Sequence, residues 1–250
     1  SFGDIVGGNL VDLTITVAIA TFFNKGLSAK SKIVQTSAMF TVAIAVLPLL
    51  LILDGVVSRG DGMVLILCFF FYIFWIFSKR ERFTKAYNKK SKAPPIKRFK
   101  VFIRDLGKVV SRLVFLLVAA EGIVRSAQFF AQNLNLPIVL IGVLIVGFAN
   151  AIPEISFAIL LAKKHQIWMI LGNLMGSVIV GSTLVLGIVA LIHPIEIVDF
   201  SHLAIARFFL VFAALFFFFF VRSDRKITKK EAIFLLSIYI LFVVAEIFIK

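Results

Sequence analysis

The chain has 250 residues, a formal net charge of +14 and 61% hydrophobic residues, while only 16% are charged. Its apolar residues come in uninterrupted runs of about 20, long enough to cross the hydrocarbon layer of a bilayer, which excludes an ordinary soluble domain. The single cysteine, Cys68, excludes an intramolecular disulfide and a multi-cysteine metal site.

Eight apolar segments follow one another along the chain. They show no alternation of polar and apolar residues and are too long for barrel strands. Helices satisfy their own backbone groups within lipid. The sequence therefore predicts an all-α fold, a polytopic bundle of about eight transmembrane helices, at residues 2–23, 33–53, 62–78, 109–130, 137–162, 167–192, 203–221 and 232–249.

The connectors between these segments alternate in charge. Of the 27 basic residues, 22 lie in the four connectors that follow the first, third, fifth and seventh segments. The intervening connectors at 54–61, 131–136 and 193–202 contain a single basic residue, Arg59. This alternation is the positive-inside bias of a multi-pass membrane protein. We expect the protein to lie in the cell membrane. It explains the net charge without a nucleic-acid partner, and the basic 79–108 stretch is expected to be a cytoplasmic loop near anionic lipid.

The start of the chain is unusual. Ser1 is not a start methionine, and the first segment begins at Phe2 and enters from the outer side. No signal-peptide pattern is present. We therefore expect an amino-terminal part to precede Ser1.

The first and sixth segments resemble each other. Gly3–Asn9 (GDIVGGN) matches Gly172–Val178 (GNLMGSV), and Thr14 then matches Thr183, at a constant offset of 169 residues. By the charge argument the two segments cross in opposite directions, which indicates an inverted-repeat transporter. The alternative is that the Gly-x-x-x-Gly spacing only allows close helix packing.

A carboxylate inside a bilayer costs roughly 2.5–3.5 kcal/mol and is therefore a functional candidate. Glu246 lies near the chain end and is expected to reach the interface. Glu121 precedes Arg125 by four residues, which predicts an ion pair on one helix face. Asp4 is expected to face water at the outer boundary. The acids within predicted spans are Asp4, Asp12, Glu121, Glu154 and Glu246.

Glu154 follows Pro153, deep in the fifth segment. Proline frees upstream carbonyls, which would add oxygen ligands beside the carboxylate. Asp12, in mid-span, and Asn150 would complete a site of oxygen ligands, which suits hard cations such as Ca²⁺ and Na⁺. The alternative is a protonated Glu154, hydrogen-bonded within a kink. No nucleophile arrangement, phosphate loop or cofactor motif appears, so we expect no enzyme, no cofactor and gradient-driven transport.

Several of these motifs resemble the sodium/calcium exchanger (calcium:cation antiporter) superfamily. The stretches Gly122–Ala127, Leu136–Gly142, Ala149–Glu154 and Leu171–Ser177 resemble its second alpha repeat. Gly3–Asp12 resembles the latter half of the first alpha repeat. The basic 79–108 stretch also stands where the family has its main cytoplasmic loop.

The resemblance implies ten helices in two inverted groups of five. On that basis residues 1–78 are the remainder of the first repeat, 79–108 the cytoplasmic loop and 109–250 the second repeat. It also implies that two helices, and the repeat partner of Glu154, precede Ser1. The 250 residues alone would then not transport.

Carried over by position, Glu154 matches the ion-binding glutamate of the family. Ser177 matches a serine that helps to coordinate sodium, and Asp12 matches a position that is usually Asn or Asp. The sequence departs from the family pattern at five positions, and these departures reduce the number of hydroxyl ligands for sodium. They leave open whether sodium, protons or potassium would be the coupling ion. The positions are Gly8, Asn150, Ala151, Val178 and Gly181.

These observations predict a secondary active cation antiporter that exchanges Ca²⁺ for Na⁺ or H⁺ by alternating access. The rivals are an exchanger of K⁺ or Mg²⁺ and a non-transporting cation-binding or regulatory membrane protein of the same fold. An ion channel would need a repeated filter sequence on symmetric subunits, and none is seen. The expected partners are cations and the lipid bilayer, and the sequence leaves the oligomeric state open.

Overall fold

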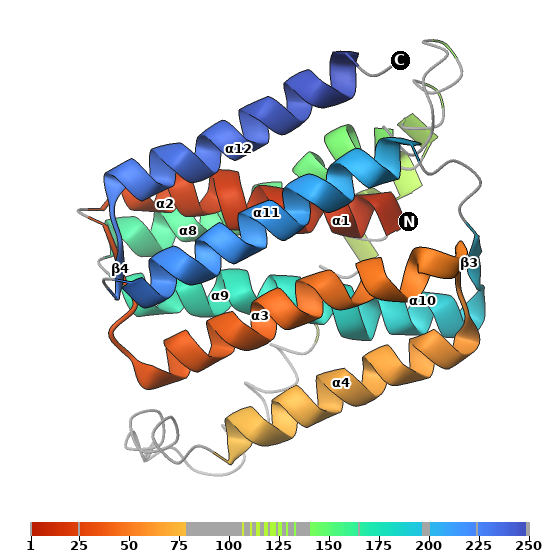
Figure 1. The fold of residues 1–250 in the computed structure, drawn as a ribbon, viewed down its shortest axis with the longest axis horizontal. Coiled ribbons are helices and arrows are strands. Elements are labelled where there is room, and N and C mark those ends of the chain that lie inside the picture. The colour runs from red at the N-terminus through yellow and green to blue at the C-terminus, as the bar shows by residue number, and fades with distance from the viewer. Residues whose placement is uncertain are drawn as a thin grey trace.

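The fold is taken from a computed structural model that describes residues 2–24, 26–78, 141–164, 166–196, 201–223 and 225–248, with isolated residues between 107 and 133. All long elements in these ranges are helices, packed side by side with their axes roughly aligned (Figure 1). The predicted 79–108 loop and the predicted helix at 109–130 lie largely outside the described residues.

Residues 2–78, where the structure describes all but Lys25, form three long helices. The first is a single span with a π-helical segment in its middle, and a two-residue strand follows each of the first two spans. In order the elements are α1 (Phe2–Val11), η1 (Asp12–Thr16), α2 (Val17–Phe22), β1 (Leu27–Ser28), α3 (Lys32–Leu51), η2 (Ile52–Asp54), β2 (Val56–Val57) and α4 (Arg59–Phe77).

The described residues of the second half form four more long helices, two of which also include a π-helical segment. In order the elements are η4 (Gly142–Val146), α8 (Gly147–Lys163), α9 (Ile167–Val180), η5 (Gly181–Val185), α10 (Leu186–Ile192), β3 (Ile195–Glu196), α11 (Ser201–Ser223), β4 (Lys226–Ile227) and α12 (Lys229–Phe248).

Six of the described helices are long and apolar enough to cross a membrane. The predicted eighth segment, α12, is also a helix, 20 residues long. The bundle carries large apolar side chains on its outside, such as Phe74 and Phe208, as expected where lipid is the solvent. The prediction of a polytopic helical membrane fold is confirmed.

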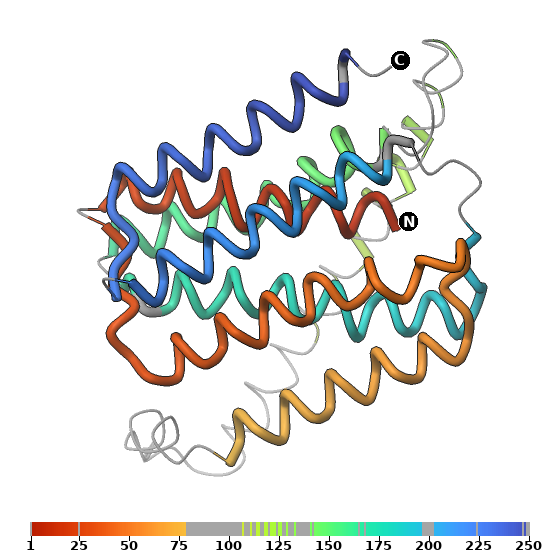
Figure 2. Tube along the Cα trace, in the orientation of Figure 1, coloured from red at the N-terminus to blue at the C-terminus, as the bar shows by residue number. Residues whose placement is uncertain are grey.

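The two halves run in opposite directions. In Figure 2 the span from α1 to α2 runs opposite to the span from α9 to α10, and α3 runs opposite to α11. The offset of 169 residues reappears in the backbone, because η1 (Asp12–Thr16) and η5 (Gly181–Val185) are separated by that number. Strand β1 pairs with β4 at one end of the bundle, and β2 pairs with β3 at the other.

Two equivalent threonines accompany the π-helical segments. Thr14 donates its hydroxyl to the carbonyl of Leu10, and Thr183 donates to that of Ile179, each at 2.5 Å. A hydroxyl bonded four residues back competes with the backbone ladder and bends a helix. We infer that these hydroxyl bonds help to stabilise η1 and η5. Segments of π-helix within α-helices are frequent at functional sites.

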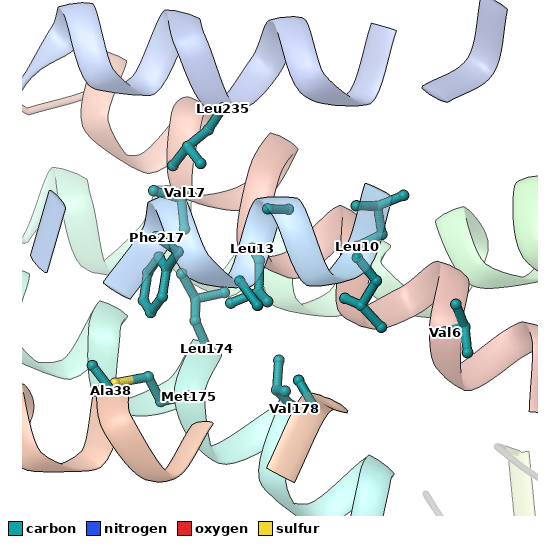
Figure 3. Close-up of a cluster of buried hydrophobic side chains, with 14 of the residues drawn as sticks. Val6, Leu10, Leu13, Val17, Ala38, Leu174, Met175, Val178, Phe217 and Leu235 are labelled. Atoms are coloured by element: carbon teal, nitrogen blue, oxygen red, sulfur yellow. The ribbon is translucent and has the colours of Figure 1, made fainter. Parts of the chain in front are cut away.

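The apolar core lies between the first span, α3, α9, α11 and α12 (Figure 3). Val6, Leu10, Leu13 and Val17 line one face of the first span at spacings of four, three and four residues. Phe217 of α11 packs among them. The first span is therefore central, and 72% of its most apolar window is buried.

Replacing Thr14 by Val keeps the side-chain shape but removes the hydroxyl bond to Leu10. We expect the free energy of unfolding to fall by about 1 kcal/mol, the usual net value of one such bond. Denaturant unfolding in detergent measures this. The control is Thr36→Val, because Thr36 makes the same kind of bond to Lys32 in α3, but this bond is exposed. Water replaces the lost partner there, so stability should change by less than about 0.5 kcal/mol. An equal loss in both variants would show that the π-helical segment has no special dependence on its threonine.

Candidate functional site

The two carboxylates that the sequence singled out lie at the centre of their helices. Asp12 is the middle residue of the span Phe2–Phe22. Glu154 lies next to the middle of the span Val143–Lys163. Each carboxylate therefore lies about halfway along a helix of membrane-spanning length, where an ionisable group is most costly and calls for a function.

A serine from a third helix joins these carboxylates. The hydroxyl of Ser177, on α9, donates to Oε1 of Glu154 over 3.3 Å. Asp12 lies close enough to Ser177 and Glu154 to interact electrostatically with both. Thr16 lies 3.5 Å from Asp12 Oδ1, and Asp12 is only 4% exposed. Helices from both halves of the chain thus bring their oxygen atoms to one point.

Close backbone packing between α1 and the η4–α8 helix holds the site together. A Cβ atom added at Gly7 would lie 2.1 Å from the carbonyl oxygen of Val143, and one added at Gly147 would lie 2.8 Å from the backbone of Gly7. Only glycine permits this approach. Six residues after Gly147, Pro153 has no N–H to bond to the carbonyl of Ala149, which leaves that oxygen without its usual helical donor.

A cavity of about 500 Å³ opens beside Glu154. Its walls come from one face of α9 and η5. A Cβ atom added at Gly172, Gly176 or Gly181 would have no atom within 4 Å, so these glycines border open space. The cavity gives an ion and its water access to the Glu154 carboxylate, whose Oε2 atom is buried without a hydrogen-bond partner among the described residues. The lining residues are Glu154, Gly172, Asn173, Gly176, Ser177, Val180, Gly181 and Val185.

The predicted ligand Asn150 takes a different partner. Its amide donates to Oδ1 of Asp4 over 2.5 Å, one helical turn before Glu154. The structure thus brings Glu154, Asp12 and Ser177 together, and it places Asn150 beside Asp4. That any of these four residues binds a cation stays a prediction.

Sequence reasoning missed two groups of polar residues. Asn9 donates to the hydroxyl of Ser182 over 2.6 Å, between the two halves of the chain. Asn173 lines the cavity, and Thr16 approaches Asp12. Asn9 and Asn173 both stand in the repeated glycine motifs, which was a usable signal, whereas no pattern marked Ser182.

The remaining acids have other surroundings. Glu121 and Arg125 form the predicted ion pair at 2.8 Å. Glu246 was expected to reach the interface, and this is wrong, because it is 1% exposed. It shares the buried face of α12 with Ile238 and Phe242, and α12 packs on α2, η1 and α11. Among the described residues, no three His, Cys, Asp or Glu side chains come together as a metal-holding group.

The site is therefore a small set of oxygen ligands rather than a nitrogen or sulfur centre. Two carboxylates and a hydroxyl meet at mid-membrane, beside an open cavity. Hard cations prefer such ligands. The arrangement can bind and release a cation.

Comparison with known proteins gives a consistent result. The family model described as sodium/calcium exchanger protein matches residues 1–78 and 106–248. An uncharacterized membrane protein of Methanocaldococcus jannaschii is 25% identical over 245 residues, covering 96% of this chain and 74% of that protein. The sodium/calcium exchanger MaX1 of Methanosarcina acetivorans is 26% identical over 148 residues, which are 59% of this chain and 42% of the exchanger.

The fold also has a solved counterpart. A structure of the sodium-calcium exchanger NCX_Mj, soaked with Na⁺ and Sr²⁺, superposes with a TM-score of 0.69. The alignment covers 97% of this chain and 75% of that one, at 23% identity. At this identity the likeness shows the fold alone.

Proposed function

Because the chain belongs to the sodium/calcium exchanger protein family, a family of membrane cation antiporters, we propose that it exchanges Ca²⁺ for Na⁺ or H⁺ across the cell membrane. The observation that carries the proposal is the convergence of Glu154, Asp12 and Ser177 at mid-span. Glu154, Asp12 and Ser177 would hold the transported cation, which is a substrate and not a resident cofactor.

Charge and ligand type favour a divalent cation. Two carboxylates match the charge of one Ca²⁺ ion, and desolvating that ion without them would be prohibitive. Calcium takes six to eight oxygen ligands. The backbone carbonyl that Pro153 frees and water from the cavity would supply the rest.

The opposed halves supply the means of transport. The first span carries Asp12, the span from α9 to α10 carries Ser177, and these two spans run in opposite directions. Inverted repeats of this kind work by moving one helix group against another around a central site. The bound cation would be exposed first to one side and then to the other.

A second candidate is a cation-binding membrane protein of the same fold that does not transport. The bond from Asn150 to Asp4 favours it, because that amide is occupied away from Glu154. Ala151 also offers no hydroxyl beside the site. Such a protein would bind the ion without a second ion to drive exchange.

Uptake of ⁴⁵Ca²⁺ into proteoliposomes that hold the whole protein separates the two. We expect uptake when an outward Na⁺ or H⁺ gradient is imposed, and the effective gradient identifies the coupling ion. Empty liposomes and vesicles without a gradient are the controls. Saturable Ca²⁺ binding without uptake under either gradient would reject exchange and favour the non-transporting protein, while exchange of K⁺ or Mg²⁺ alone would correct the carried ion.

A further inference from the structure

A second polar contact joins the two halves of the chain beside the cation site. Asn9 Nδ2 donates to Ser182 Oγ over 2.6 Å. The two side chains are 6% and 0% exposed. Neither residue lines the cavity beside Glu154, so this pair is distinct from the groups that would hold the ion.

The two contacts lie on the same pair of antiparallel helices. Asn9 precedes Asp12 by three residues on the first span, and Ser182 follows Ser177 by five residues on the α9–η5 span. Since the spans run in opposite directions, Asn9 meets Ser182 about one turn from the place where Asp12 meets Ser177. A slide of one span along the other would break both contacts together.

Apolar packing alone does not set such a register strongly. In lipid the hydrophobic effect does not favour one helix position over another, and buried polar bonds between helices supply the specificity. The core residues near this crossing, Leu10, Leu13 and Val178, are aliphatic and could repack after a slide. The hydrogen bond between Asn9 and Ser182, in contrast, can form at only one axial position of the two spans.

We propose that Asn9 and Ser182 are positioning residues, whose buried hydrogen bond fixes the axial register of the two site-bearing helices so that Asp12 stays level with Ser177 and Glu154. The bond joins Ser182 in η5 to Asn9 in the helical turn that precedes η1. This inference rests on the proposed function, because it takes Asp12, Ser177 and Glu154 as the cation site.

The decisive comparison is between Ser182→Val and Ser182→Thr. Both variants add the same bulk at a fully buried position, but only threonine keeps the hydroxyl. Asn9→Leu removes the donor from the other side. Should the added methyl group prevent folding in both variants, Ser182→Ala removes the hydroxyl without adding bulk, and wild type is its reference.

Two readouts are needed, both on the whole protein with Cys68→Ser. Spin labels at Phe23 and Ile192, exposed at opposite ends of the two spans, report an axial slide directly as a change in distance. Equilibrium binding of Ca²⁺ reports the site. For Ser182→Val and Asn9→Leu we expect a shifted or broadened distance distribution and binding weakened by roughly 10- to 100-fold, as for other groups that orient metal ligands.

Ser182→Thr should match wild type in both readouts. Equal distances and equal affinities for the Val and Thr variants would overturn the proposal, as would a distance change without a change in affinity. If wild type binds no Ca²⁺, the proposed function is wrong, and the distance comparison still decides whether the bond sets the register.

Discussion

Replacing Glu154 by Gln is expected to reduce gradient-driven Ca²⁺ uptake by roughly 100-fold or more, beyond the range seen when only the supporting shell of a metal site is altered. The substitution keeps the size of the side chain and a hydrogen-bond acceptor for Ser177. It removes one of the two charges that would balance the ion at mid-membrane. Of the two carboxylates that the described residues place at the site, only Asp12 would then offset a divalent cation in a low-dielectric setting.

Glu196→Gln is the matched control for this variant. Glu196 lies exposed in β3, at the end of the bundle, and its loss should leave uptake unchanged. A thermal unfolding curve shows whether Glu154→Gln is still folded. Uptake at the wild-type rate in folded Glu154→Gln protein would remove Glu154 from the site and the proposed mechanism with it.

Hydropathy and charge alternation predict the helices well, because both depend on composition along the chain. The predicted segments that fall within the described residues are helical, and the offset of 169 residues, found from Gly3–Asn9 and Gly172–Val178, recurs in η1 and η5. The pairing of β1 with β4 was not predicted, since two-residue strands leave no pattern. The division at 79–108 stays a prediction.

The site could be predicted only in part, because it depends on which helix faces meet. Mid-span acids were visible as costly residues, so Asp12 and Glu154 could be named from sequence. That Ser177 joins them came only from the family resemblance. Glu246 was misjudged because distance from the chain end says nothing about the face of α12 that packs inward.

The bond between Asn9 and Ser182 shows the limit most clearly. Its residues are 173 positions apart, and they meet only in one register of two antiparallel helices. Asp4 and Asn150, which are 146 positions apart, likewise meet only because α1 packs against α8. Each residue by itself is an ordinary polar residue in an apolar run, and nothing local predicts its partner.

The other large effect is expected from the glycines, and the repeat supplies its own control. Gly7 and Gly176 are equivalent under the offset of 169 residues. A Cβ atom at Gly7 would lie 2.1 Å from the backbone oxygen of Val143, whereas one at Gly176 has no atom within 4 Å. Because a backbone atom cannot rotate away, Gly7→Ala must push α1 off the η4–α8 helix.

We therefore expect Gly7→Ala to lower the free energy of unfolding of this chain by about 3 kcal/mol or more, at the upper end of the overpacking range. Gly176→Ala should change it by less than about 0.5 kcal/mol, as for substitutions that meet open space. Denaturant unfolding of both variants in the same detergent measures the difference. Moving α1 also separates Asp12 from Glu154, so Gly7→Ala should weaken Ca²⁺ binding in any protein that remains folded. Equal stability of the two variants would mean that α1 and α8 do not pack closely through Gly7 and Gly147. Another contact would then have to hold Asp12 close to Glu154.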